Sequence, residues 1–315
     1  MPTRRAALLG AVCLLTSGCA VFAEPPQTAA LALAPPAGLP PRAELRDAPF
    51  FPQTPYHCGP AALATVLTYV GLATTPEQLS DAVFLPSREG ALQTEMTAAA
   101  RRFGALAVPL PSQLVAVLAD VAAGHAVVVL QNLGLSFVPR WHYAVIVGYD
   151  LEARELVLRS GTVEREVMRF NLFERTWARG GYWAVVALPP GLLPASAAEV
   201  DAVQAAIGFE RVAAPAQALR AYDSVVERWP GNLLAGLGQG NTRFAAGDMA
   251  GAAQAFERVA VQHDSAAAWH NLAAVRLLQG DRAGAQVAAE HALARAQATE
   301  PQWLPAATAM LAQTR

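Results

Sequence analysis

The chain has 315 residues, of which 54% are hydrophobic and only 15% are charged, and its net charge is −2. This composition allows a sizeable core and argues against a disordered chain, while the length favours two domains over one. The small net charge, without any basic cluster interleaved with aromatic residues, excludes nucleic acid as an expected partner.

Residues 1–19 have the pattern of a secretory leader. Two arginines precede a short apolar run, which ends in small residues and Cys19. The run is too short to span a bilayer, as is typical of a signal peptide. Because it ends in Gly-Cys, the segment resembles a lipoprotein leader, although Thr16 stands where such leaders usually carry leucine. The resemblance implies lipidation of Cys19 and a lipid anchor to the membrane. The alternative is an ordinary signal peptide cut nearby.

The residue after the anchoring cysteine bears on location. Ala20 occupies the position where aspartate would favour retention in the inner membrane. We therefore expect an exported protein of the bacterial cell envelope, on the periplasmic face of the outer membrane. Residues 20–48 contain three Pro-Pro pairs, and proline of this density favours an extended tether over a packed element.

Residues 49–190 are predicted to form one α+β domain. Four helices are expected first. They lie at 61–70, at 93–103, at 112–123 and, between the first two of these, from the capping box that Thr75 and Gln78 form. Short β-branched or aromatic runs follow, at 125–130, 141–149, 155–159, 164–170 and 182–188, with a short helix near Asn171 between the last two. Helices followed by antiparallel strands indicate an α+β fold and not a wound parallel sheet.

Cys58 is the single cysteine outside the predicted leader, because Cys13 and Cys19 lie within it. One thiol excludes a disulfide scaffold, and no Cys/His spacing matches a zinc site, so neither a metal nor a cofactor is expected. The residues Cys58-Gly59-Pro60 open the first predicted helix. Backbone N–H groups at a helix start stabilise a thiolate and can bind the oxyanion formed when it attacks a carbonyl. Gly59 would also let the substrate backbone approach closely.

A cysteine nucleophile needs an imidazole as its base, and the chain has six histidines. His57 adjoins the thiol, but its side chain should diverge from that of Cys58, and three others fall in the C-terminal helices. Of the remaining two, His125 and His142, the second opens the predicted strand 141–149, whose start would project toward the helix end. We therefore expect His142 to be the base.

Two motifs carry a resemblance to a known family. Gln53-x4-Cys58-Gly-Pro-Ala opens a helix, and His142-Tyr-x-Val-Ile-x-Gly opens a strand. Over residues 50–188 the chain resembles the cysteine peptidases that remove double-glycine leaders from bacteriocins, and their stand-alone relatives. The resemblance implies a papain-like fold, with Cys58 as nucleophile, His142 as base and Gln53 in the oxyanion hole.

One feature of that family is missing. Its members usually orient the histidine with an aspartate on the next strand, where this chain has none. A hairpin turn near residue 152 would pair His142 with Thr162 and place Ser160 close by. Ser160, Thr162 or Asn132 could accept the imidazole N–H, though more weakly than a carboxylate. Either the pair works with a neutral partner, or activity is reduced or lost.

Residues 191–315 are rich in alanine and are predicted to be helical throughout. Ala218, Tyr222 and Val225 recur 34 positions later and again after a further 33, as Ala252, Phe256 and Val259 and as Ala285, Ala289 and Ala292. This period resembles tetratricopeptide repeats, which implies paired helices and a concave groove for a peptide or partner protein. The alternative is a helical extension that only packs on the first domain.

Three functions are consistent with these patterns. The first is a cell-envelope cysteine peptidase that cleaves peptides or proteins and uses the helical repeats to recruit a substrate or protein partner. The second is a weak or inactive peptidase fold that serves as a protein-binding scaffold, which the missing aspartate favours. The third is acyl or amide transfer at the same thiol.

Overall fold

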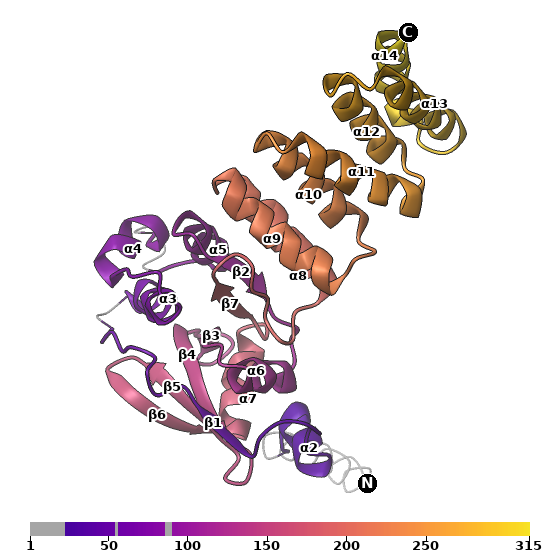
Figure 1. Cartoon of the computed structure of the whole chain (residues 1–315). Coiled ribbons are helices and arrows are strands. Elements are labelled where there is room, and N and C mark those ends of the chain that lie inside the picture. The colour runs from indigo at the N-terminus through magenta and orange to yellow at the C-terminus, as the bar shows by residue number, and fades with distance from the viewer. Residues whose placement is uncertain (1–22, 54–55, 86–89) are drawn as a thin grey trace, which may run out of the picture.

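The structure is a computed structural model and describes residues 23–53, 56–85 and 90–315. The chain forms an α+β domain with an antiparallel sheet, from which a stack of helices extends toward the C-terminus (Figure 1). The fold class expected from the sequence is therefore confirmed. Cys19 and the predicted leader lie outside the described residues. Within those residues, no helix is both long and apolar enough to cross a membrane.

The described residues form a seven-stranded sheet in which every pairing is antiparallel. The strands follow the order β2-β7-β3-β4-β5-β6, and β1 pairs with the part of β4 that extends past β3. Their bounds are β1 Arg42–Glu44, β2 Leu106–Pro109, β3 Val127–Asn132, β4 Trp141–Asp150, β5 Glu155–Ser160, β6 Val163–Arg169 and β7 Ala184–Leu188.

Helices cover both faces of this sheet (Figure 1). One face packs against α3 (Cys58–Tyr69), α4 (Pro76–Val83) and α5 (Gln93–Arg102), and the other against α6 (Leu114–Ala122) and α7 (Phe170–Arg179). Side chains alternate along each strand, so that Tyr143, Val145 and Val147 of β4 point toward α3 while Ala144 and Ile146 point toward α6 and α7. Both faces of the central strands are buried for this reason.

Local signals in the sequence place most of these elements correctly. The Thr75 side chain accepts the backbone N–H of Gln78, whose own side chain accepts that of Thr75, so the predicted capping box begins α4. Gly104, with φ of 88°, follows the end of α5. Strand β2 was not predicted, because four residues are too few to show a two-residue period. Tertiary contacts stabilise β2, which pairs with β7 and packs on the C-terminal helices.

Part of the predicted tether is packed structure, and the expectation of an extended segment is wrong there. Residues Pro26–Leu33 form helix α2, and Arg42–Glu44 form β1. The buried carboxylate of Glu174 accepts the backbone N–H of Gln27 at 2.9 Å, and the backbone N–H and hydroxyl of Thr28 at 2.6 Å each. Proline at the first helical position favours a helix start, which the proline count alone conceals.

The C-terminal region contains seven α-helices within the described residues: α8 Glu199–Glu210, α9 Pro215–Arg228, α10 Leu233–Ala245, α11 Met249–His263, α12 Ala266–Leu278, α13 Arg282–Ala298 and α14 Leu304–Thr314. The recurring residues of the sequence period all lie buried on α9, α11 and α13. Two of the turns also have the same geometry. Gly247 and Gly280 have φ of 80° and 82°, and the aspartate after each accepts a backbone N–H three residues later at 2.9 Å. The period is therefore a structural repeat of paired helices.

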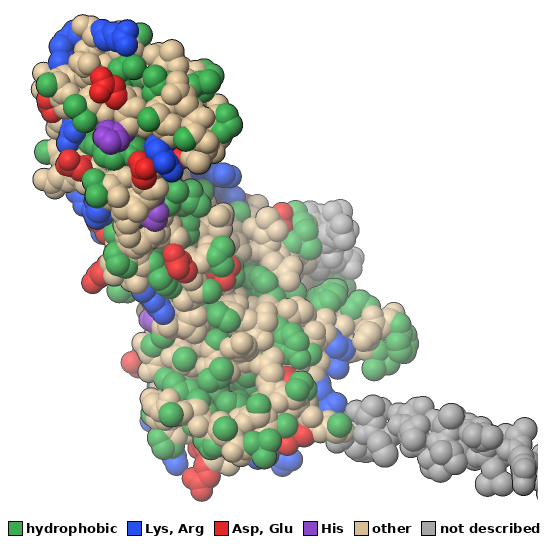
Figure 2. Space-filling model, turned by 90° about the vertical axis from the view of Figure 1, so that its right-hand side faces the viewer, with side chains coloured by type: hydrophobic (Ala, Val, Ile, Leu, Met, Phe, Trp, Pro, Cys, Tyr) green, Lys and Arg blue, Asp and Glu red, His purple; other side chains and the backbone are tan. Residues whose placement is uncertain are grey.

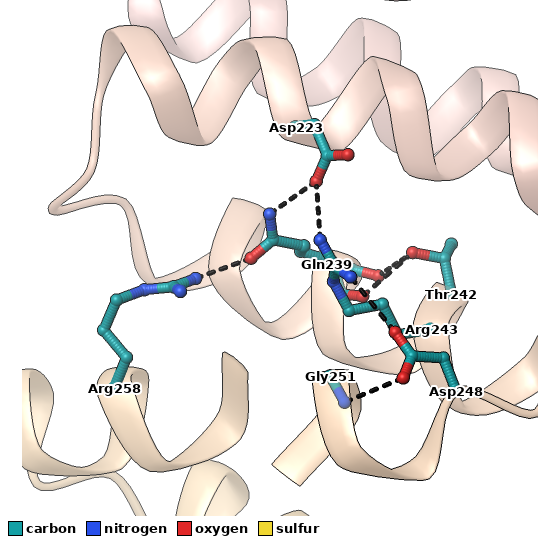
Figure 3. A network of polar contacts seen from close by, with 8 residues as sticks. Asp223, Gln239, Thr242, Arg243, Asp248, Gly251 and Arg258 are labelled. Carbon is teal, nitrogen blue, oxygen red and sulfur yellow. Dashed lines mark hydrogen bonds and ion pairs between the residues drawn. The ribbon is translucent and has the colours of Figure 1, made fainter. Parts of the chain in front are cut away.

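Small residues and one polar network hold neighbouring helices of this region together. A Cβ atom at Gly238 would lie 2.3 Å from the ring of Tyr222, so glycine is required for α9 and α10 to approach. Gln239 of α10 donates to Asp223 of α9 and accepts from Arg258 of α11, both at 2.6 Å (Figure 3). This network links three consecutive helices.

The α+β domain and the helical region share a packed junction. Leu106 and Val108 of β2 are buried among residues of α8 and α9. The fully buried carboxylate of Asp120 accepts the backbone N–H groups of Ala195 at 2.8 Å and Ser196 at 3.2 Å, which fixes the connecting segment to α6. On the face shown in Figure 2, side chains of both charges are interspersed, without a patch of a single sign.

Candidate active site

The candidate nucleophile, Cys58, is the first residue of α3 and is half-buried. The first helical hydrogen bond runs from the Ala61 N–H to the carbonyl of His57 at 3.2 Å, and Pro60 has no N–H to offer. The backbone N–H groups of Cys58 and Gly59 are therefore directed at the start of the helix, where the thiol lies.

The pKa of the Cys58 thiol is subject to opposing effects. Burial, the largest effect, raises this pKa, while hydrogen bonds from the backbone N–H groups of Tyr143, Gly59 and Cys58 itself lower it. The net shift is upward, so the resting thiol is protonated at neutral pH. The contact from Tyr143 also places the sulfur against the backbone of the residue that directly follows His142.

The predicted role of Gly59 needs correction. A Cβ atom at this position would lie 2.8 Å from Cβ of Ala91 and 3.2 Å from Sδ of Met96. The space beside Gly59 is filled by the chain itself, so glycine is required for the start of α3 to pack against these residues. Close approach of a substrate does not explain it.

His142 is the second residue of β4 and is half-buried. Its Nε2 atom lies 3.0 Å from Oγ of Ser160, which leaves Nδ1 for a different partner. Burial lowers the pKa of the imidazole; the charge of Glu166 opposes this shift, and that of Arg140 adds to it. The net shift is downward, so the resting imidazole is neutral.

The thiol and the imidazole line one cavity of about 1270 Å³. Strand alternation assigns His142 to the same face as Ala144, which is opposite to α3. However, His142 lies at the end of β4, where the cavity opens, and the sulfur contacts the adjacent backbone. The cavity is lined by Gln53, Tyr56, Cys58, Gly90, Ala91, Leu92, Gln93, Leu130, Pro139, Arg140, Trp141, His142, Tyr143, Gly161, Thr162, Arg179, Gly180 and Gly181.

Gln53, the candidate oxyanion donor, is held on both its backbone and its side chain. Its N–H donates to the carbonyl of Gly161 at 2.9 Å, and its Nε2 donates to the carbonyl of Tyr143 at 3.3 Å. The carboxamide nitrogen carries a second hydrogen, and the residue lines the cavity together with Cys58.

The three candidate partners of the imidazole lie in different surroundings. Ser160 is 7% exposed and contacts His142 directly. Thr162 lines the cavity and is exposed. Asn132 is engaged elsewhere, since its carboxamide oxygen accepts two backbone N–H groups of the 133–140 loop at 2.9 Å each. The geometry thus brings Ser160, and not Asn132, to the imidazole.

The β4–β5 hairpin carries an irregularity that the sequence did not reveal. The register pairs Asp150 with Glu155 at the turn and shifts beside Val147, after which Val145 pairs with Arg159. This β-bulge places one extra residue, Val147, in β4. The pairs beyond the bulge have the register expected for a turn near residue 152, and the last of them, Val145 with Arg159, lies one residue from Ser160 and three from His142.

Part of the cavity wall comes from residues that the sequence did not reveal. Arg179, Gly180 and Gly181 connect α7 to β7, and Arg179 donates to the carbonyl of Asn132 from Nε at 3.2 Å and Nη2 at 2.9 Å. No local motif marks these residues, because only the pairing of β7 with β3 brings them to the cavity. Within the described residues, no three His, Cys, Asp or Glu side chains are placed to share a metal ion.

Comparisons with known proteins agree with this geometry over the first domain. Residues 45–185 match the model of a family described as the Peptidase_C39 like family, and this range contains Gln53, Cys58, His142 and Ser160. A search of the curated proteins finds no match. This part of the chain is thus similar to C39-like peptidases.

Several solved structures are similar to part of the chain. A C39-like peptidase from Bacillus anthracis, described as putative, has 18% sequence identity and a TM-score of 0.40, covering 47% of this chain and 97% of its own. The peptidase domain of Streptococcus ComA, a bifunctional ABC transporter, has 19% identity and a TM-score of 0.37, covering 45% and 98%. The Yersinia enterocolitica type III secretion chaperone SycD, in complex with a peptide of YopD, has 18% identity and a TM-score of 0.34, covering 36% and 88%.

Proposed function

We propose that this chain is a cysteine peptidase in which Cys58 attacks a peptide carbonyl and His142 transfers the proton. The observation that carries the proposal is the joint position of thiol and imidazole on one cavity, with the backbone N–H of Tyr143, the residue after His142, near the sulfur. The match of residues 45–185 to a peptidase family supports the same chemistry.

The reaction starts from a neutral pair. As the sulfur of Cys58 bonds to the carbonyl carbon, its proton passes to the free ring nitrogen of His142, and the carbonyl electron pair moves to oxygen. The backbone N–H of Cys58 and the carboxamide of Gln53 stabilise that oxyanion. The C–N bond then breaks, the imidazolium donates its proton to the leaving amine, and water hydrolyses the thioester through the same steps.

The remaining parts of the chain suit a recruited substrate at the cell envelope. The Gly-Cys end of the leader supports lipidation of Cys19, and Ala20 supports an outer-membrane location. The paired helices with a period of 33–34 residues support tetratricopeptide-type recognition of a peptide or protein. We therefore assign recruitment to the helical region and bond cleavage to the α+β domain.

Alkylation of Cys58 by iodoacetamide, followed by site-resolved mass spectrometry, tests the pair without a known substrate. We expect His142→Ala to slow the reaction at pH 7 by roughly 100-fold, the effect of losing a positioned base. His125→Ala is the matched control, because His125 bonds Asp120 at 2.9 Å at the end of α6, outside the cavity. Equal rates in the wild type and His142→Ala would contradict the peptidase proposal and leave an inert buried thiol.

The second candidate is a peptidase-fold scaffold that binds proteins without cleaving them. The neutral Ser160 at the position of the expected carboxylate favours it. Comparing envelope peptides from cells with the wild type and with Cys58→Ser separates the two. Peptides whose abundance differs between the wild type and Cys58→Ser support hydrolysis, and identical peptide pools support the scaffold.

A further inference from the structure

The proposed mechanism leaves one charge without a stabilising group. When His142 accepts the proton it becomes an imidazolium cation, and its direct partner Ser160 is neutral. A hydroxyl can accept the imidazole N–H, but it offsets a buried positive charge less well than a carboxylate does. The next strand outward, β6, is the nearest part of the sheet that carries acidic residues beyond Ser160.

Sheet register places one acidic residue of β6 on the face of the imidazole. Glu166 pairs with Leu158, and Leu158 pairs with Ile146. Paired residues in a sheet share a face, as do residues two apart on one strand. Ser160 is two residues from Leu158 on β5 and shares its face, although a register shift on the β6 side pairs Ser160 with Val163. His142 likewise shares the face of Ile146 on β4. The imidazole, the hydroxyl and the carboxylate thus lie on three successive strands of one face.

Burial distinguishes Glu166 from its neighbours on β6. Glu166 is half-buried, whereas Glu164, Arg165 and Val167 are exposed. Arg165 points to the other face, where its Nε atom pairs with Glu44 at 2.8 Å. Glu166 is thus the acidic residue of β6 that turns toward the sheet interior.

The charged surroundings of His142 agree with this placement. The charge of Glu166 raises the pKa of the imidazole and that of Arg140 lowers it. Among the described residues, the titratable or charged groups that act on the imidazole or line its cavity are Tyr56, Cys58, Arg140, Tyr143, Glu166 and Arg179. Within the described residues, Glu166 is the carboxylate of this set, so it is the group that can offset the charge of the imidazolium.

We propose that Glu166 is the positioning carboxylate of this site and acts on His142 through the hydroxyl of Ser160. This inference rests on the proposed function, since it gives His142 a catalytic cation to stabilise. Ser160 accepts the Nε2–H of the imidazole and directs its own hydroxyl proton toward Glu166. The carboxylate thus comes from the second strand beyond His142, not from the strand next to it.

Glu166→Gln tests the charge while preserving the shape of the side chain, with iodoacetamide as the probe of Cys58. We expect the alkylation rate at pH 7 to fall by roughly tenfold, because an imidazolium without its carboxylate is less stable. The acid limb of the rate profile should move to lower pH, because the pKa of His142 falls further. Glu166→Asp should restore part of the rate.

Glu164→Gln is the matched control, since it removes the same charge from an exposed position on the same strand. It should leave both the rate and the profile unchanged. Arg140→Gln should move the acid limb the other way, to higher pH. NMR titration of His142 in each variant measures the same change in its pKa without any alkylation.

The outcomes separate this inference from the proposed function. If the wild type shows no His142-dependent alkylation, the proposed function fails. If alkylation depends on His142 but Glu166→Gln and Glu164→Gln have the same profile, the assignment of Glu166 is wrong and Ser160 acts without a carboxylate.

Discussion

At the scale of single residues, the resting state of the Cys58–His142 pair follows from burial. Taking either group out of water disfavours its charged form, which raises the pKa of the thiol and lowers that of the imidazole. The three backbone N–H groups at the sulfur act against this effect without reversing it. The charged pair is therefore expected to form only as the thiol reacts.

This resting state predicts a particular dependence on pH. His142 must be neutral to accept the thiol proton, and its pKa is lowered, so the alkylation rate of Cys58 should rise with pH around a midpoint below the ordinary imidazole value of about 6.5. In His142→Ala the thiol must ionise alone. Its midpoint should then lie above the ordinary thiol value, because burial raises the pKa of Cys58.

Rates measured between about pH 4 and pH 10 check both midpoints. A midpoint at the ordinary thiol value in both proteins would contradict the coupling of the two groups. In Cys58→Ser, the adducts that still form measure the background alkylation elsewhere on the chain.

Site residues that belong to a short local motif could be predicted, and those placed only by the register of the strands could not. Cys58, Gln53 and His142 stand in two short motifs, each tied to the start of an element, and the structure places all three on one cavity. Glu166 and Arg179 have no such motif. Their positions depend on the register of β5 with β6 and of β7 with β3, which local patterns do not encode.

At the scale of elements, the start of α3 is fixed by a tight contact. Ala91 and Met96 fill the space beside Gly59, and the resulting position of the helix start directs its free N–H groups at the sulfur. The chemistry at Cys58 therefore depends on a packing contact as well as on the helix start itself.

Gly59→Ala is expected to destabilise the fold by about 1–3 kcal/mol, the usual cost of adding a methyl group to a filled space. Urea unfolding measures the loss. The double variant Gly59→Ala/Ala91→Gly removes the methyl group 2.8 Å away and should recover much of the stability. If the double variant is no more stable than Gly59→Ala, the contact with Ala91 is not the cause.

Elements with strong local signals were predicted well, and those held by distant partners were not. The repeated glycine–aspartate turns and buried alanines of α11 and α13 are local features, and the structure has them at the expected positions. Helix α2 depends on Glu174, which lies 146 residues from Thr28. A local sequence pattern cannot reveal a contact between residues so far apart in the chain. The density of proline therefore predicted an extended segment.

At the scale of the whole molecule, the docking of α2 shortens the connection to the proposed anchor. Six residues, 20–25, separate Cys19 from the start of α2. Even fully extended, this segment spans at most about 25 Å. If Cys19 is lipidated, the α+β domain is therefore held close to the membrane surface, and its cavity samples substrates near that surface.

Cys19→Ser should release the protein from the membrane fraction of lysed cells, because it removes the proposed lipid attachment. The alkylation rate of Cys58 should stay unchanged, since the cavity contains no part of the leader among its described lining residues. Cys13→Ser is the matched control: it removes a thiol from the same leader and should leave the protein with the membranes. Immunoblots of the separated fractions give the distribution. A Cys19→Ser protein that still sediments with the membranes would show that something other than this cysteine holds the domain there.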